Sequence, residues 1–146
     1  MAFLFQRKIM RNEETAVAKR NKGYNCAQAV VCTYCEKYGL DEQTAFKISE
    51  GLGTGLGCTL GTCGALNAAC MLAGMTISTG NLEQPNSKGK TYPVTREITK
   101  RFIEETGAAR CRDIKGLDTG TVLCECEDCV RIACRLVDEY LIKDHE

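Results

Sequence analysis

Cysteine is the residue type that sets this sequence apart. The chain of 146 residues contains eleven cysteines, but one histidine and no tryptophan. In a small secreted protein, such an excess would predict a framework of disulfide bonds. Here the count is odd, and the first apolar residues are too few for a secretory signal. We therefore expect a cytoplasmic protein whose thiols are reduced, metal-bound or catalytic.

The positions of the cysteines separate candidate functional thiols from thiols that fill the core. A helix N-terminus stabilises a thiolate because free backbone N–H groups and the positive end of the helix dipole meet there. We expect Cys26, Cys63 and Cys126 at or near helix starts, and Cys111 in a short turn. Glycine-rich backbone, with Gly64 directly after Cys63, supplies the N–H groups that an iron-sulfur cluster favours. These five residues are the predicted cofactor-binding set.

The segment 124–129 adds further candidate metal ligands. Cys124, Cys126 and Cys129 give C-x-C and C-x-x-C spacings, each able to chelate one metal or to close a redox disulfide. Cys129 therefore joins Cys26, Cys63, Cys111 and Cys126 as a candidate metal ligand. A zinc site is the weaker interpretation, because the other C-x-x-C, Cys32 to Cys35, is remote in sequence and expected in mid-helix. Three cysteines expected inside helices are predicted to pack as small apolar residues: Cys32, Cys35 and Cys134.

Other classes of protein are excluded by charge and by motif. Nineteen basic and nineteen acidic residues are interleaved, which argues against nucleic acid as the main partner. No run approaches the roughly 20 apolar residues of a membrane span. The single histidine, His145, leaves almost no material for a catalytic triad. Gly89-Lys90-Thr91 is not a P-loop, because Gln84 stands where that motif needs its first glycine.

Helical periodicity with glycine punctuation predicts the elements that position these thiols. We expect one all-α domain over residues 1–146, a compact bundle of about five to six helices without a sheet. A glycine-rich loop over 51–64 should precede the central helix, where Cys70 is either a further ligand or a small buried residue. Asn25 and Asp41 are predicted N-caps, and Pro93 is predicted in a first helical turn. The predicted helices cover about 5–22, 26–38, 42–50, 63–78, 93–106 and 125–143.

Four short runs resemble one known family over nearly the whole chain. They are Tyr24-Asn25-Cys26-Ala27-Gln28-Ala29-Val30, Thr62-Cys63-Gly64-Ala65-Leu66, Cys111-Arg112, and Cys126 before Val130-Arg131. Together they are similar to the C-GCAxxG-C-C family, which is described as redox-active. A related domain occurs in a split-Soret type cytochrome, beside an iron-sulfur centre. The resemblance therefore implies electron transfer or thiol redox work.

The four cysteine positions of the family fall on Cys26, Cys63, Cys111 and Cys126, with Cys124 and Cys129 as competing registers for the last. Ala68 replaces the closing glycine of the Cys-Gly-Ala-x-x-Gly motif, which still permits close helix packing. The chain has no C-x-x-C-H for haem attachment.

Three hypotheses for function follow. The first is a [2Fe-2S] or [4Fe-4S] iron-sulfur cluster, held by Cys26, Cys63, Cys111 and Cys126, for electron transfer or redox sensing. The second is a metal-free thiol-disulfide oxidoreductase in which Cys63 and Cys26 are the redox thiols. The third is a structural zinc or metal-binding protein. We expect a redox partner protein of unknown identity, no nucleic acid and no membrane span, and we leave a homodimer open.

Overall fold

Helices form the body of the protein. The computed structural model describes residues 10–142, and within that range it contains seven α-helices and no strand. The helices are α1 (Asn12–Asn21), α2 (Cys26–Tyr34), α3 (Glu42–Ser49), α4 (Gly64–Ile77), α5 (Lys88–Thr106), α6 (Cys111–Lys115) and α7 (Cys126–Val137). The all-α prediction is confirmed. The first residues of the predicted helix 5–22 and the end of the predicted helix 125–143 lie outside the described residues.

Local capping explains where two of these helices begin. The Asn25 side chain accepts a hydrogen bond from the backbone N–H of Gln28, and the Gln28 side chain accepts one from the Asn25 N–H. The Asp41 side chain accepts from the backbone N–H of Thr44 at the start of α3. Both predicted N-caps are confirmed. The predicted end of the helix 26–38 is also confirmed, since α2 continues only as a 3-10 turn, Cys35–Tyr38, before Gly39 takes a left-handed φ of 74°.

Two segments differ from the prediction. Helix α5 begins at Lys88, so Pro93 lies in its second turn rather than its first. The prediction was wrong because proline here removes only the one hydrogen bond that its missing N–H would make, and the helix continues on both sides. The stretch predicted as a glycine-rich loop contains two short helical turns, Glu50–Leu52 and Gly55–Thr59. Left-handed backbone occurs at Thr54, just before the second turn, and at Gly55 and Leu56, its first two residues.

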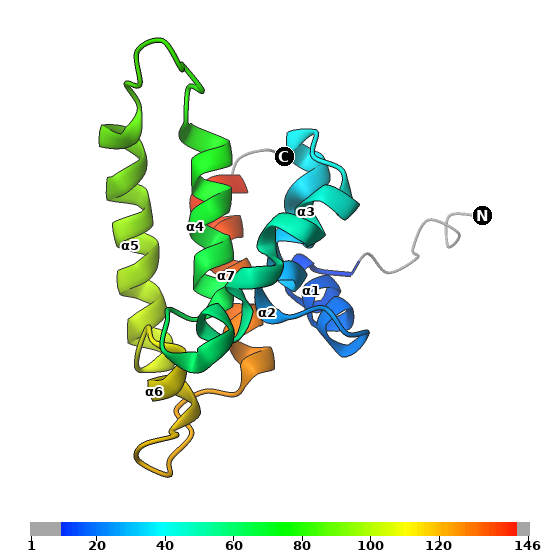
Figure 1. Cartoon of the computed structure of the whole chain (residues 1–146), viewed down its shortest axis with the longest axis vertical. Helices are drawn as coiled ribbons and strands as arrows, with labels where there is room; N and C mark the ends of the chain where they lie inside the picture. The colour runs from blue at the N-terminus through cyan, green and yellow to red at the C-terminus, as the bar shows by residue number, and fades with distance from the viewer. Residues whose placement is uncertain (1–9, 143–146) are drawn as a thin grey trace, which may run out of the picture.

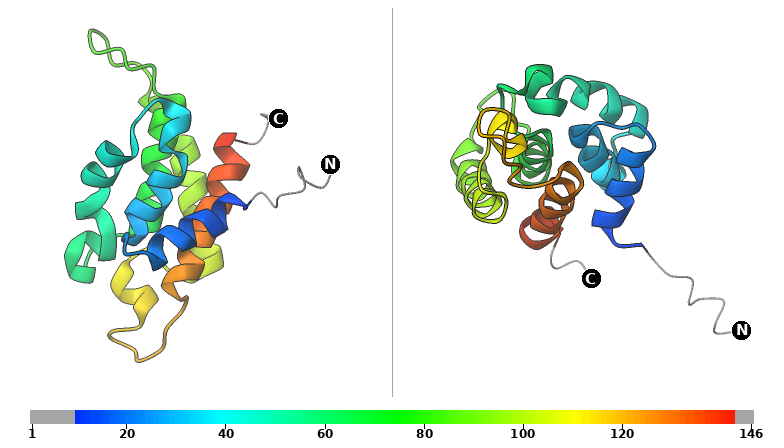
Figure 2. Two further views of the ribbon diagram at one scale, coloured as in Figure 1. Left: turned by 90° about the vertical axis from the view of Figure 1, so that its right-hand side faces the viewer. Right: turned by 90° about the horizontal axis from the view of Figure 1, so that it is seen from below.

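The helices pack around α4, and three of them begin at the same end of the bundle. Helix α4 packs against α2, α5 and α7, while α1 crosses α2 and α7 (Figures 1 and 2). The largest fully buried side chains join these elements and include Tyr34, Leu66, Phe102 and Leu136. Helices α2, α4 and α7 all begin at the lower end of Figure 1, beside the short α6. Their positive dipole ends therefore meet in one region.

No helix in the described part of the chain combines the length and the apolar character that a membrane crossing requires.

Candidate functional site

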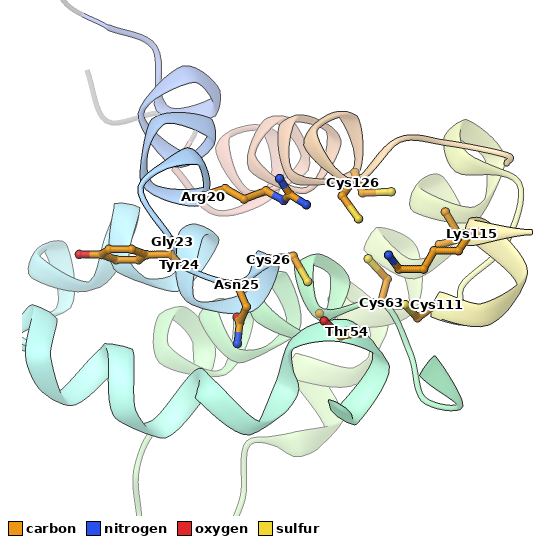
Figure 3. A pocket seen from close by; sticks show the side chains of 13 residues that line it. Arg20, Gly23, Tyr24, Asn25, Cys26, Thr54, Cys63, Cys111, Lys115 and Cys126 are labelled. Atoms are coloured by element: carbon orange, nitrogen blue, oxygen red, sulfur yellow. The ribbon is translucent and has the colours of Figure 1, made fainter. Parts of the chain in front are cut away.

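A cavity of about 210 Å³ lies where these helices begin (Figure 3). Cysteines from α2, α6, α7 and the residue before α4 line it: Cys26, Cys63, Cys111, Cys126 and Cys129. Gly64 lines it as well. The structure thus brings together the four cysteines of the predicted cluster, Gly64 and Cys129, but not the alternative candidates Cys124 and Cys70. Whether these thiols hold a cofactor stays a prediction.

A short backbone bridge sets Cys63 beside Cys111. Thr62 and Arg110 form an isolated antiparallel bridge. The N–H of Cys63 donates to the carbonyl of Ala109 at 2.8 Å, and the N–H of Cys111 donates to the carbonyl of Gly61 at 2.9 Å. Two cysteines that are remote in sequence are therefore held together by main-chain hydrogen bonds, which do not depend on side-chain rotamers.

Two glycines permit the close approach of other chain segments to these cysteines. A Cβ on Gly55 would overlap the Cβ of Cys111 and the carbonyl oxygen of Gly61. A Cβ on Gly64 would lie 2.6 Å from the Sγ of Cys26, well inside ordinary van der Waals contact. Only glycine lets Cys26 lie directly over the first residue of α4.

Backbone N–H groups face the sulfur atoms. Cys26, the first residue of α2, receives backbone hydrogen bonds from Thr54 and Ala27, both of which lower the pKa of its thiol. A backbone hydrogen bond from Ala65 does the same for the thiol of Cys63. Such donors stabilise sulfur that carries negative charge, whether it is a free thiolate or a metal ligand.

Despite these donors, the thiols of the cavity resist ionisation. Hydrogen bonding to Cys129, together with burial, raises the pKa of Cys63 to about 12. Hydrogen bonding to Cys63, together with burial, raises the pKa of Cys26 further still. Burial raises the pKa of Cys111, whereas Lys115 lowers it. Several neighbouring thiolates would repel one another here unless a positively charged group lay between them.

Comparison with known proteins places the chain in a family. The family model described as "Putative redox-active protein (C_GCAxxG_C_C)" matches residues 24–140, which is well over half of the chain. The chain belongs to the C_GCAxxG_C_C family. A search of curated proteins and a search of solved structures each found no match. The matched residues include all five cysteines of the cavity.

Other cysteines of this C_GCAxxG_C_C protein lie outside the cavity. Cys70 lines a separate groove beside α5 and is therefore not placed with the candidate ligands. Cys124 does not line the cavity but hydrogen-bonds to Cys129, so it lies at the edge of the thiol cluster. Cys58 is exposed on the Gly55–Thr59 turn. The cysteines predicted to pack in the core are buried as expected: Cys32, Cys35 and Cys134.

The cysteine side chains line a cavity but do not converge on a single metal-ion position. Within residues 10–142, no group of three or more His, Cys, Asp or Glu side chains has the mutual geometry to hold one metal ion. A single water molecule occupies roughly 30 Å³ of liquid, so the cavity of about 210 Å³ has room for a group of several atoms. The arrangement suits a larger inorganic group better than a lone ion.

Two cations in the cavity wall were not singled out by the sequence. Arg20 lies in the last turn of α1 and Lys115 is the last residue of α6, and both line the cavity. No sequence signal marked them, because lysine and arginine are interleaved with acids along the whole chain.

Proposed function

We propose that the cavity binds an iron-sulfur cluster through Cys26, Cys63, Cys111 and Cys126, and that the protein uses it for electron transfer or redox sensing. The observation that carries this proposal is the convergence of cysteines from four separate segments on one cavity. Thiolate sulfur is the usual ligand of such clusters. The redox description of the C_GCAxxG_C_C family supports the same conclusion.

The chemistry of the cavity wall fits this group. Among the described residues, no carboxylate and no imidazole lines the cavity, so sulfur is the only strong metal donor that side chains offer there. Helix starts and backbone N–H groups meet the sulfurs and would stabilise the negative charge of a thiolate-bound cluster. When bound, the cluster would supply one-electron redox chemistry.

The burial of the thiols indicates how electrons would reach the site. Cys63 and Cys111 are buried, whereas Cys26 and Cys126 are half-buried. The first pair would shield one side of the bound group from water, and the second pair leaves its other side near the protein surface. A redox partner protein could therefore approach the side of Cys26 and Cys126.

Cys126 is the preferred fourth ligand, with Cys129 as the alternative on the same helix. Both line the cavity, and they are three residues apart on α7, which places them on neighbouring positions of one helix face. Cys126 is the first residue of α7 and has free backbone N–H groups around it. Cys129 is buried and hydrogen-bonds to the thiol of Cys63.

The two alternatives are less well supported. A thiol-disulfide oxidoreductase attacks with a thiolate, but burial and neighbouring thiols raise the pKa of Cys63 to about 12 and that of Cys26 as well. The shifts disfavour the thiolate form that such an enzyme needs. A zinc ion needs ligands that converge on one point, and no such group exists among the described side chains.

Anaerobic purification tests the proposal. Iron, sulfide and visible absorption are measured after reconstitution in the wild type and in the variants C26S, C63S, C111S and C126S. The wild type should contain iron and sulfide, and each of the four variants should lose most of both. The matched control is C58S, since Cys58 is exposed and outside the cavity, and it should load like the wild type. Far-UV circular dichroism separates loss of cluster from loss of fold.

Two results would contradict the proposed iron-sulfur site. A wild-type protein that stays colourless and free of iron after reconstitution contradicts it. So does equal iron content in all five variants, because iron would then bind elsewhere.

A further inference from the structure

The wall of the cysteine cavity carries positive charge only. Its lining includes the two cations Arg20 and Lys115 and, among the described residues, no Asp or Glu. Figure 3 shows the two side chains entering from opposite sides, Arg20 from α1 toward Cys126 and Lys115 from α6 toward Cys63. The chain as a whole is neutral, with 19 basic and 19 acidic residues. The positive cavity is therefore a local feature and not a result of composition.

These two cations also have no ion pair, and they differ in burial from the other described lysines and arginines without one, which are all exposed. Both are half-buried, and neither side chain has a hydrogen bond or an ion pair with any described residue. The neighbour of Arg20 in sequence, Lys19, is bonded to Glu42 at 2.8 Å. Six other arginines pair with carboxylates: Arg11, Arg101, Arg110, Arg112, Arg131 and Arg135.

Half-buried cations without a partner favour an anionic occupant. Partial burial removes some of the water that solvates a charge, and a nearby negative charge offsets that cost. Arg20 and Lys115 therefore favour a negatively charged group in the cavity.

The charge of a thiolate-bound cluster fits this pair. Four thiolates around an oxidised iron-sulfur core leave about two net negative charges. Arg20 and Lys115 would balance them. One-electron reduction adds a further negative charge, and two cations facing the same space favour that state.

We infer that Arg20 and Lys115 are the counter-charges of the cluster, which help to retain it and raise its reduction potential. This inference rests on the proposed iron-sulfur function and adds to it two positioning residues that are not ligands. Arg20 lies before residue 24, where the match to the family model begins.

Reduction potentials test this inference. The variants R20Q, K115Q and the double variant are reconstituted together with the conservative variants R20K and K115R. Midpoint potentials come from a titration with dithionite, a one-electron donor, and iron content is measured in parallel. The matched control is R96Q, because Arg96 also lacks a carboxylate partner but lines a different groove beside α5.

Neutralisation should shift the potential to more negative values in each single variant and furthest in the double variant. R20K, K115R and R96Q should stay near the wild type. Loss of iron from the neutral variants alone, with full loading of R20K, K115R and R96Q, supports the same role. Unchanged potentials and iron contents in R20Q, K115Q and the double variant overturn the inference and leave the proposed function standing. A wild type that takes up no iron overturns both.

Discussion

Replacing Gly64 with alanine probes how closely α2 approaches the start of α4. The added Cβ would lie 2.6 Å from the Sγ of Cys26, 2.8 Å from the carbonyl oxygen of Leu52 and 3.0 Å from the Cα of Gly53. Carbon atoms in good contact are roughly 3.5 to 4.0 Å apart. Because two of the three neighbours are backbone atoms, a side-chain rotation cannot relieve the overlap. Overpacking of this kind costs about 1 to 3 kcal/mol.

Gly74→Ala is the matched control within the same helix. No atom lies within 4 Å of a Cβ built on Gly74, and that residue is well inside α4. Alanine there should stabilise the protein by about 0.5 to 1 kcal/mol, because glycine is the weaker helix former. G64A should therefore be less stable and G74A more stable than the wild type, and their free energies of unfolding should differ by about 1.5 to 4 kcal/mol.

Urea unfolding of the reduced, metal-free proteins measures this difference. With a slope of about 2 kcal/mol per M, the midpoints of G64A and G74A should be separated by roughly 1 to 2 M. Reconstituted G64A should also bind less iron than G74A, because the new methyl group displaces the Sγ of Cys26. If G64A unfolds at the same urea concentration as G74A, the close approach of α2 to α4 is refuted.

Three further predictions concern the elements around the site. Asn25→Ala removes the cap that begins α2 and its exchange of hydrogen bonds with Gln28, so it should lower the free energy of unfolding by about 1 kcal/mol, measured by urea. Tyr34→Phe removes a buried hydroxyl that donates to α7 and should cost about 1 kcal/mol in the same assay, with equal stability as the contrary result. Hydrogen bonding to Lys19 holds the pKa of Glu42 below its ordinary value of 4.5. The Glu42 carboxylate therefore stabilises the fold above pH 4.5, and this stabilisation is lost as the pH falls through the folded-state pKa of Glu42. The variant E42Q should consequently lose less stability than the wild type on acidification.

Short-range features of the fold could be predicted from the sequence, because their causes lie within a few residues. Asn25 and Asp41 cap helices through the N–H group three residues later, and Gly39 ends its helix by its own backbone freedom. Pro93 was placed wrongly because the general preference of proline for a first turn does not decide where a particular helix begins.

The site depended on contacts that no local pattern contains. Helix-start cysteines could be nominated, and the family resemblance selected Cys26, Cys63, Cys111 and Cys126 among them. The bridge between Thr62 and Arg110, which sets Cys63 beside Cys111, joins segments almost fifty residues apart and leaves no sequence signature. Arg20 and Lys115 are notable because they line the cavity, half-buried and without a carboxylate partner, which a sequence of interleaved charges does not reveal.

X-ray absorption at the iron edge of the reconstituted wild-type protein tests the central claim most directly. The proposed ligation predicts that the nearest neighbours of each iron are sulfur atoms, with a second iron at short range, and that both signals disappear in C63S but not in C58S. A nearest shell of oxygen or nitrogen without neighbouring iron, or an identical spectrum in C63S, would contradict a cluster held by the cysteines of this cavity.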